Sequence, residues 1–512
     1  MKKIISMLLL CAMLLPSIAC ASDTDKETPD TTAAQTTGVQ ANIVTNEVEP
    51  ISEALEALDY EGTTISVLQR TPPKDASGST GANYQYTNEL FAEELTNDPI
   101  NDAIYNRNLA VSDLLGVEFV EDFAHGYTEL QQKVDVMVNS GDTTYDIVAS
   151  SAAYSTPLIL KGEVFNLYDN GIDTYLDATK PWWPQYWIEE AEISDRLYCI
   201  TGGPALSLSR LMVVWFYNKT MGETHNVENL YDVVNEGRWT MDYVSELAST
   251  IYRDLNGNDQ RDTEDEYGIA IDDYDNVDIF WSGFDLKLIN KNSDGDLELN
   301  TSNREKIFNA YEMIYSLIYE NTGSLYYRDP DFEGSNYPRQ AQMFANGTVL
   351  LAPLHLQYAE TSGFRNMHDE YGILPTPKYD ENQKDYYSYV HDQYTIFMIP
   401  ITVRDAEMSG AVLEAMAYES YKTLTPAYFE VALKGRYAND PESRTMIDMI
   451  TSNVLVDTAI IYGGLIDYPA AKLLRGNMEY GNSSIASTYE GYARMLPKVL
   501  KALVAELNEF DY

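Results

Sequence analysis

The sequence predicts an α/β fold that is divided into two lobes. The chain has 512 residues, which is more than one compact core usually contains. Hydrophobic residues make up 45% and charged residues 22%, a composition typical of globular proteins. Two separate stretches, residues 60–150 and residues 210–355, each alternate strand-like and helix-like patterns. Each stretch can therefore form its own sheet with helices packed on it.

The N-terminus has the pattern of an export signal. Two lysines precede an apolar run at residues 4–15, which is too short to span a bilayer. Ala19 then precedes Cys20, which resembles the signal of a bacterial lipoprotein, in which this cysteine is lipidated. We expect a signal peptide at residues 1–19 and an anchor at Cys20, which would hold the protein on the extracellular face of the cytoplasmic membrane, in the cell envelope. The alternative is an ordinary secretion signal that is cleaved beside a neighbouring alanine.

The segment after the signal is expected to be a flexible connection. Residues 20–59 contain no aromatic residue and are rich in Thr, Asp, Glu and Ala, which predicts a disordered tether. Beyond the anchor only Cys199 remains, so the mature chain can form no internal disulfide. The net charge of −46 argues against nucleic acid as a partner and against adhesion to anionic lipids. We expect a monomer.

The first stretch predicts a parallel sheet. A capping box of Thr128 with Gln131 is expected to begin its second helix, and Gly141 to end it. A βαβαβ order places the ligand crevice at the carboxyl ends of the strands. The expected elements are a strand at 63–70, a helix at 100–116, a strand at 117–123, a helix at 127–142 and a strand at 145–150.

The second stretch repeats this alternation without repeating the sequence. Thr240 is expected to cap a helix whose apolar side chains share one face, and the final apolar run ends at His355. The expected elements are a strand at 210–221, a helix at 239–254, a strand at 267–273, a helix at 304–320 and a strand at 347–355.

Motifs spread over residues 140–440 resemble the extracellular solute-binding proteins of family 1, the lipoprotein receptors of ABC importers for sugars. They include YDIVASS, VVWFYNKTM, GRWTMDYVSELA, DLNGNDQRDTEDEYG, MFANGTVLLAP, YGILPTPKYDENQKDYYSYV and ALKGRY. The resemblance implies a two-lobed periplasmic-binding-protein-like fold of type 2, whose lobes are joined by crossing hinge segments. By that likeness the crossings fall near 202–211, 371–380 and 420. The first lobe would comprise 60–205 with 380–420, and the second 206–379 with 421–512.

The same resemblance implies a function without chemistry. A carbohydrate, expected to be an oligosaccharide, would be captured between the lobes and delivered to the permease of an ABC importer. Two alternatives stay open: a receptor of this fold for a peptide or other small solute or a sensor partner, and a secreted glycosidase. The sequence contains no HExxH, GxSxG or phosphate-loop motif, so no enzyme class is indicated and no catalytic cofactor is expected.

The acidic segment at 253–268 predicts a structural calcium site. Its oxygen-bearing residues follow the spacing of an EF-hand-type loop, and a ligand set without His or Cys suits calcium. A solvated acidic turn is the alternative; a catalytic metal is disfavoured because the loop would saturate its own ligands. The expected ligands are Asp254, Asn256, Asn258, Gln260 through its backbone, Asp262 and Asp265.

Candidate ligand-binding residues follow the predicted strand ends. Aromatic planes can stack on the C–H faces of a sugar, and polar side chains can bond its hydroxyls. For each residue, ordinary packing or loop hydrogen bonding is the alternative. Trp281 was expected after a strand, as a stacking platform. The candidates are Arg70, Ser150, Ser151, Tyr154, Trp281, His355, Tyr358, His391, Asp392 and Tyr394.

Overall fold

The computed structural model describes six ranges of the chain, all within one compact unit, Ile43–Tyr512. The predicted signal peptide, Cys20 and the tether as far as residue 48 lie outside the described residues. In the ranges that are described, no helix combines the length and the apolar character needed to cross a membrane. The ranges are 49–71, 89–271, 275–293, 295–326, 339–429 and 441–510.

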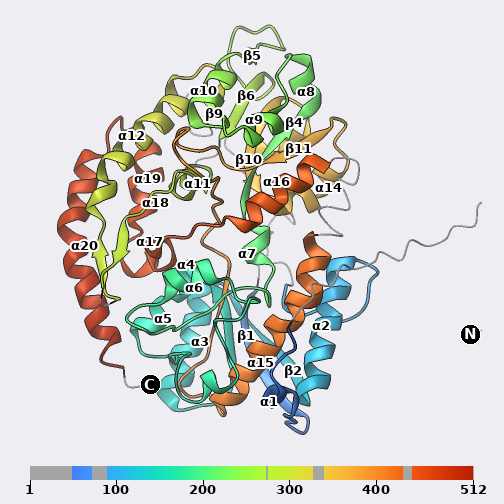
Figure 1. The fold of residues 1–512 in the computed structure, drawn as a ribbon, viewed down its shortest axis with the longest axis vertical. Helices are drawn as coiled ribbons and strands as arrows, with labels where there is room; N and C mark the ends of the chain where they lie inside the picture. The colour runs from blue at the N-terminus through green and yellow to red at the C-terminus, as the bar shows by residue number, and fades with distance from the viewer. Residues whose placement is uncertain are drawn as a thin grey trace, which may run out of the picture. The chain divides into compact units, whose positions relative to one another are not determined.

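One sheet has four strands in the order β12-β3-β1-β2. Strand β1 pairs in parallel with both β2 and β3, whereas β12 runs antiparallel to β3. The parallel arrangement predicted for the first stretch is therefore confirmed. We call this sheet and the helices packed on it the first lobe (Figure 1). Its strands are β1 (Thr63–Thr71), β2 (Val117–His125), β3 (Ile147–Ser151) and β12 (Thr395–Met398).

The helices of the first lobe begin and end at sequence signals. Asp98 caps α2 by accepting hydrogen bonds from the backbone N–H groups of the first turn, and Gly116, at φ 63°, ends it. Helix α3 ends at Gly141 as predicted. The helices are α2 (Pro99–Leu115), α3 (Tyr127–Ser140), α4 (Ala152–Ser155), α5 (Pro157–Leu160), η2 (Ile172–Thr174), α6 (Gln185–Ala191), α7 (Ser207–Arg210), α15 (Ala406–Glu419) and η6 (Ser420–Leu424).

The predicted capping box at the start of α3 is wrong. Gly126 is the N-cap residue, and it offers no side-chain bond. Gln131 instead donates a hydrogen bond to the backbone carbonyl of Tyr154. The reason is tertiary: the turn after β3 offers Gln131 an acceptor, and this contact replaces the local one.

The second sheet has the strand order β11-β4-β10-β6-β5, and β9 also pairs with β6. Strand β10 is parallel to β6 and antiparallel to β4. We call this sheet and its helices the second lobe. All of the side chains of β4, β6 and β10 are buried, as in a sheet covered on both faces. Its strands are β4 (Val213–Asn218), β5 (Tyr252–Arg253), β6 (Glu266–Ile271), β9 (Ser324–Tyr326), β10 (Val349–His355) and β11 (Tyr371–Leu374).

Helices and a hairpin complete the second lobe. Thr240 caps α10 as predicted, through a bond from the backbone N–H of Tyr243. The further elements are α8 (Lys219–Thr224), α9 (Leu230–Asn235), α10 (Met241–Ser249), α11 (Asp275–Gly283), β7 (Ile289–Lys291), β8 (Leu297–Leu299), η3 (Thr301–Asn303), α12 (Arg304–Tyr315), η4 (Ser316–Glu320), α13 (Arg339–Ala345), η5 (Leu356–Glu360) and α14 (Ser362–Arg365).

The C-terminal helices contact both lobes. Helix α16 packs against β11 and α9, whereas α17 touches α4 and α6 of the first lobe. Helix α20 contacts α5 as well as the strand β8. These elements are α16 (Pro441–Ser452), α17 (Thr458–Ile461), η8 (Gly463–Leu465), α18 (Pro469–Leu473), α19 (Arg475–Met478) and α20 (Ala486–Leu507).

Two described segments carry the chain between the sheets. Residues 201–212 lead to β4, close to the predicted crossing at 202–211. The return occurs at 386–394, where Val390 forms an isolated bridge with Met212 of the outgoing segment. The segment that returns to the first sheet therefore lies later in the chain than the predicted crossing at 371–380. The reason is that β11, within that predicted range, still pairs with β4 in the second sheet. The apolar run of β11 is thus a buried strand and not a hinge.

The third predicted crossing, near 420, falls inside a helical segment. Helix α15 continues directly into η6, which contacts α2 in the first lobe. The chain reaches α16 through residues 430–440, which lie outside the described residues. The position of this crossing therefore stays a prediction.

The end of the predicted tether is part of the fold. A short helix, α1 (Glu53–Glu56), begins at Ser52, whose side chain accepts a hydrogen bond from the N–H of Leu55. Ile51 and Leu55 are buried. Ile51 and Leu55 are four residues apart, so they lie on the same side of the segment and pack together against the core. The average composition of residues 20–59 gave no sign of this local apolar pair. The tether prediction is therefore wrong for residues 49–59.

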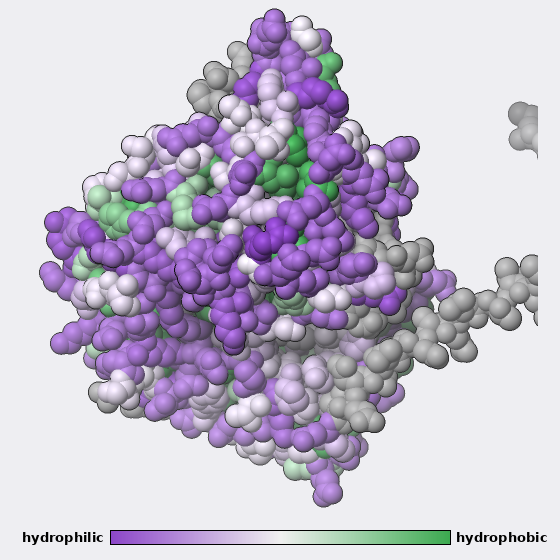
Figure 2. Space-filling model, turned by 45° about the horizontal axis from the view of Figure 1, so that its top comes forward, coloured by the Kyte–Doolittle hydropathy of each residue, from purple (hydrophilic) through white to green (hydrophobic). Residues whose placement is uncertain are grey.

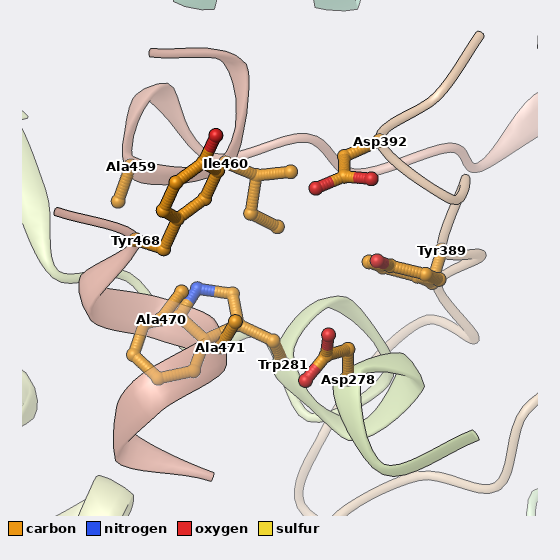
Figure 3. A pocket seen from close by; sticks show the side chains of 9 residues that line it. All are labelled: Asp278, Trp281, Tyr389, Asp392, Ala459, Ile460, Tyr468, Ala470 and Ala471. Atoms are coloured by element: carbon orange, nitrogen blue, oxygen red, sulfur yellow. The ribbon is translucent and has the colours of Figure 1, made fainter. Parts of the chain in front are cut away.

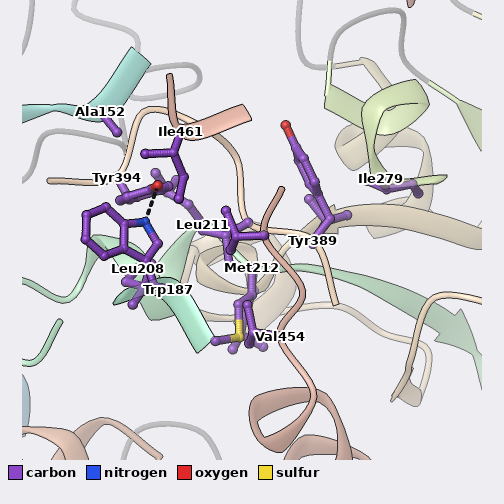
Figure 4. Close-up of a cluster of buried hydrophobic side chains, with 14 of the residues drawn as sticks. Ala152, Trp187, Leu208, Leu211, Met212, Ile279, Tyr389, Tyr394, Val454 and Ile461 are labelled. Carbon is purple, nitrogen blue, oxygen red and sulfur yellow. Dashed lines mark hydrogen bonds between the residues drawn. The ribbon is translucent and has the colours of Figure 1, made fainter. Parts of the chain in front are cut away.

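A continuous apolar core extends across the junction of the lobes. Figure 4 shows Trp187 of the first lobe at one side of a buried cluster, Leu211 and Met212 of the outgoing segment in its middle, and Ile279 of α11 at its other side. Outside this core, the face drawn in Figure 2 is largely hydrophilic, in keeping with the net charge of −46. The junction is thus held by packing, and the described Cys199 is a free thiol in its interior.

Candidate functional site

A pocket lies where α11, the returning segment and the C-terminal helices meet (Figure 3). Its cavity volume is about 20 Å³ in this arrangement of the chain, which is room for about one water molecule. Its charged side chains are the carboxylates of Asp278 and Asp392, and its aromatic residues are Trp281, Tyr389 and Tyr468. The other lining residues are Ala459, Ile460, Ala470 and Ala471.

The two carboxylates enter the pocket from different elements. Asp278 is supplied by α11, and its Oδ2 forms an ion pair with Nε of Arg475 at 3.0 Å. Asp392 is supplied by the returning segment, and about a quarter of its side chain is exposed (24%). Figure 3 shows both carboxylates directed into the same space. An uncharged ligand with several hydroxyl donors would find acceptors on two walls.

Trp281 lines the pocket but does not follow a strand. It lies within α11, so that part of the prediction is wrong, and its side chain is 1% exposed. The indole N–H donates a hydrogen bond of 3.0 Å to Oδ2 of Asp457. A ring buried to this degree has little free face for stacking. Its clearest role is to hold α11 against the N-terminus of α17.

Asp457 is the acceptor that completes this link. It caps α17 through the N–H of Ala459, at 2.9 Å, and it also accepts the N–H of Leu288, at 2.9 Å. Burial raises the pKa of Asp457 to about 6, although the three hydrogen bonds oppose that shift. Because Ala459 and Ile460 line the pocket, this network fixes one of its walls.

Tyr468 connects the pocket to the first lobe. Its hydroxyl donates a hydrogen bond of 2.9 Å to the carbonyl of Ala153, just after β3. The N–H of the same residue, Ala153, donates to the carbonyl of Asp392, also at 2.9 Å. The segment that follows β3 is thus linked by two hydrogen bonds to residues that line the pocket, and the crevice at the strand carboxyl ends stays a prediction.

Arg70 and Tyr154 lie beside this pocket, although they do not line it. Nη2 of Arg70 donates a hydrogen bond of 3.4 Å to Oε1 of Gln393, the residue after Asp392. Burial lowers the pKa of Arg70 to about 10. The ring of Tyr154 stacks on that of Tyr127, with 4.2 Å between their centres. The structure thus brings two predicted residues to the rim of the junction.

His355, Tyr358 and His391 form a cluster of their own. The two imidazole rings are 5.4 Å apart, and the ring of Tyr358 lies 6.4 Å from that of His355. All three side chains are buried. Their expected placement at strand ends is correct, but none of them lines the pocket. They pack where β10 meets the returning segment.

Three other candidates are interior residues. Tyr394 is fully buried in the first lobe, and its hydroxyl accepts a hydrogen bond of 2.6 Å from the indole of Trp187 (Figure 4). Ser150 and Ser151 are buried in β3, and Ser155 donates to the hydroxyl of Ser150 at 2.6 Å. All three side chains are buried in this arrangement and none lines the pocket, so their role in binding stays a prediction. The sequence pattern of β3 and of the residues before β12 is continuously apolar or mixed, so it could not show which side chains face the cleft.

Sequence reasoning missed most of the pocket wall. Asp278 belongs to an amphipathic helix, and Tyr389 stands two positions before a residue that was predicted. Tyr468 and the alanines of α18 come from the C-terminal region, in which no binding motif was recognised. The short Tyr–Pro–Ala–Ala run at 468–471 was the available signal, because small residues beside an aromatic can form a wall close to a ligand.

The acidic loop is closed by its own hydrogen bonds. Asp254 accepts the N–H groups of Gly257 (2.6 Å) and Asp259 (2.9 Å), and both Asn256 and Asn258 donate to Oδ2 of Asp262. Four of the predicted calcium ligands are therefore gathered in one exposed loop. Among the described residues, no group of three or more His, Cys, Asp or Glu side chains is arranged to hold a metal ion.

Asp265 has a different position from the other loop residues. It is fully buried, and it accepts hydrogen bonds from the hydroxyl of Tyr252 and from the N–H groups of Leu255 and Asp262. The N–H of Gln260 donates to Asn258 at 2.7 Å. Asp265 thus ties the loop to the sheet, which accounts for its conformation without an ion.

Solved structures share this fold. One is a solute-binding protein of an ABC transporter from Thermotoga lettingae bound with α-D-tagatose (13% identity, TM-score 0.52, covering 86% of this chain and 100% of that chain). Another is the galacto-N-biose-/lacto-N-biose I-binding protein of Bifidobacterium longum (10%, 0.52, 88% and 98%). A third is UgpB from Mycobacterium tuberculosis in complex with glycerophosphocholine (15%, 0.52, 79% and 96%).

These similarities confirm the predicted fold class. The chain has the two-lobed α/β fold of the solute-binding proteins of ABC transporters. No family model matches the chain, and no curated protein matches its sequence. At identities of 10–15% the similarity shows a shared fold, and it does not identify the ligand-binding residues of this chain.

Proposed function

We propose that the protein is a receptor that captures a carbohydrate at the junction of its lobes and releases it unaltered to the permease of an ABC importer. One observation carries this proposal. The pocket at the junction offers carboxylate acceptors on two walls and aromatic residues between them. Sugars present many hydroxyl donors together with apolar C–H faces, so such a lining suits them.

The charge of the pocket narrows the class of sugar. Asp278 and Asp392 are acceptors, and no Lys or Arg is among the residues that line the pocket; Arg475 is paired with Asp278 from outside that lining. An anionic sugar would bring like charge against two carboxylates. The cavity of about 20 Å³ is too small for a sugar ring, so a ligand would enter only when the walls move apart. We therefore propose a neutral sugar, bound as part of an oligosaccharide, whose entry requires the lobes to open.

A ligand held in this way would favour a closed arrangement of the lobes. Asp392 belongs to a crossing segment, and Asp278 belongs to the second lobe, so one ligand can bond to both. A ligand shifts such an equilibrium only by its difference in affinity for the two states. Micromolar binding corresponds to about 8 kcal/mol, part of which would drive closure. The ligand would then be delivered to the permease when the two lobes open again.

The lipid anchor at Cys20 and the position outside the cytoplasmic membrane belong to the same proposal. A tethered receptor would keep its ligand close to the permease. Metabolic labelling with a palmitate analogue tests the anchor directly. Labelling of the full chain that is lost in Cys20→Ala supports it, and equal labelling of both chains contradicts it.

We also propose that the acidic loop binds calcium as a structural ion. Asp254, Asn256, Asn258 and Asp262 would supply side-chain oxygens and Gln260 its carbonyl, while Asp265 holds the loop closed. The gathering of these side chains in one exposed loop supports the proposal. Extracellular sites of this kind bind calcium at roughly 10⁻⁴ to 10⁻³ M. Millimolar calcium should raise the melting temperature, and Asp262→Asn should abolish the rise; an unchanged melting temperature would exclude the site.

A panel of ligands tests the receptor against its alternatives. Neutral oligosaccharides should raise the melting temperature and bind in a saturable way, whereas short peptides and uronic acids should not. Asp392→Asn should weaken the binding of sugar, and Glu118→Gln, which removes an exposed carboxylate elsewhere in the first lobe, should not. Binding of peptides alone would favour the peptide receptor. Release of reducing sugar from the bound ligand would support the alternative that the protein is a glycosidase.

A further inference from the structure

A second and larger pocket lies in the first lobe. Its cavity volume is about 480 Å³, and it shares no lining residue with the pocket at the junction. Its walls come from the loop around η2, from α15 and from the residues just before α1. The packing of these elements does not by itself explain why a pocket lies between them.

The lining of this pocket has a consistent chemistry. Carboxylates outnumber cations: four acidic side chains line it, and the one amine, Lys180, lies 3.9 Å from the carboxylate of Asp177. Aromatic rings stand between the acids. The acids are Asp173, Asp177, Glu192 and Glu414, and the aromatic residues are Tyr168, Tyr175 and Trp182. Lys180 already lies over the ring of Trp182, 5.9 Å from its centre, and Trp182 is 4% exposed, so the rings with accessible surface are those of Tyr168 and Tyr175. Carboxylates combined with such ring faces recognise organic cations.

The side chain of Glu414 holds the walls of the pocket in place. It is 3% exposed and belongs to the middle of α15. Its carboxylate accepts the indole N–H groups of Trp182, at 2.9 Å, and Trp183, at 2.8 Å, and the backbone N–H of Asp177, at 3.3 Å. Two indoles and one backbone group from the same loop thus converge on one acid, which fixes the aromatic wall before any ligand arrives.

Glu192 also lines the pocket. Its Oε2 accepts a hydrogen bond of 3.2 Å from the hydroxyl of Tyr168, which leaves the second oxygen for a ligand. Asp173 and Asp177 are exposed at the mouth of the pocket. A cation entering the pocket would therefore pass the acids at the mouth and meet an oriented carboxylate inside.

We propose that this pocket binds an organic cation, an alkylammonium or guanidinium group, independently of the sugar site. The group can come from a free polyamine or from a lysine or arginine side chain of a polypeptide. Both sources carry the same chemistry. The pocket is a second binding site on the receptor, and its occupancy is not linked to the carboxylates at the junction.

A fluorescence titration of the full chain with spermidine tests this site. Trp182 lines the pocket, so binding there should change the emission of tryptophan. The variant Asp173→Asn with Glu192→Gln should raise the dissociation constant about tenfold, because two attractive contacts are lost. The matched control Glu118→Gln removes an exposed acid of the same lobe outside the pocket, and it should leave the constant unchanged. Asp392→Asn should also leave it unchanged.

Two arms distinguish the source of the cation. A trilysine peptide and spermidine are titrated in parallel, and 1,8-octanediol serves as the uncharged probe. Tighter binding of spermidine assigns the site to a free amine, and tighter binding of the peptide assigns it to a protein side chain. The proposal is overturned if neither probe saturates the signal, if octanediol binds equally well, or if Glu118→Gln weakens binding as much as the pocket variant does.

Discussion

Replacing Glu414 with glutamine should change how the stability of the protein depends on pH. Burial raises the pKa of Glu414 from 4.5 to about 7, against the effect of the indole bonds of Trp183 and Trp182. A carboxyl whose pKa is higher in the folded chain than in the unfolded chain binds more protons when folded. Its contribution to stability is therefore complete below about pH 4.5 and is lost as the pH rises through about 7.

The size of the effect follows from these two pKa values. Between about pH 5 and about pH 8, the contribution of Glu414 to the free energy of unfolding should fall by about 2–3 kcal/mol. Glutamine does not titrate, so Glu414→Gln loses this dependence. Near pH 8 the variant should still be less stable by about 1–3 kcal/mol, because its amide N–H group faces one of the indole donors. The advantage of the natural protein should thus be largest in acid.

Urea unfolding of both proteins, followed by tryptophan emission, measures this difference at each pH. Other titrating groups cancel when one protein is subtracted from the other, since they are common to both. A difference that shrinks by about 2–3 kcal/mol from about pH 5 to about pH 8 supports the reasoning. A difference that stays constant would mean that Glu414 is ionised in the folded chain throughout, and the account of its burial would be wrong.

Three further changes test the packing and the proposed sugar site. Leu55→Ala should lower the free energy of unfolding by about 2–5 kcal/mol in urea unfolding, because Leu55 is fully buried. An unchanged free energy of unfolding would mean that residues 49–59 belong to the disordered tether after all. Trp281→Phe should cost about 1–3 kcal/mol by the same assay, because the buried acceptor Asp457 loses a donor, and Asp457→Asn should show a smaller additional loss on that background. Asp392→Asn should weaken the binding of a neutral sugar about tenfold by calorimetry without changing the melting temperature of the free protein, and equal affinities would remove Asp392 from the site.

The sequence was sufficient for the parts of the fold that depend on local signals. The cap Thr240 and the glycines that end α2 and α3 act within one or two turns, so their positions can be found without a structure. The apolar runs of β3 and β10 are equally local. The calcium loop and the lipid anchor rest on motifs as well, and they stay predictions.

The site itself depends on contacts between distant parts of the chain. Trp281 was found as a candidate, yet its partner Asp457 lies in the C-terminal region, and only their hydrogen bond shows that the ring is held inside. Tyr394 and Asp392 are two positions apart, but one is in the core and the other borders the pocket. Residues near a crossing segment do not follow a simple alternation, so their direction could not be read from the pattern.

Calorimetric titration with a panel of neutral oligosaccharides, followed by chromatography of the recovered ligand, tests the main proposal most directly. The account predicts that one sugar binds to the natural protein with one-to-one stoichiometry, that Asp278→Asn and Asp392→Asn each weaken it, and that the sugar is recovered intact. Binding that is unaffected by both substitutions, or recovery of a shortened sugar, would contradict it.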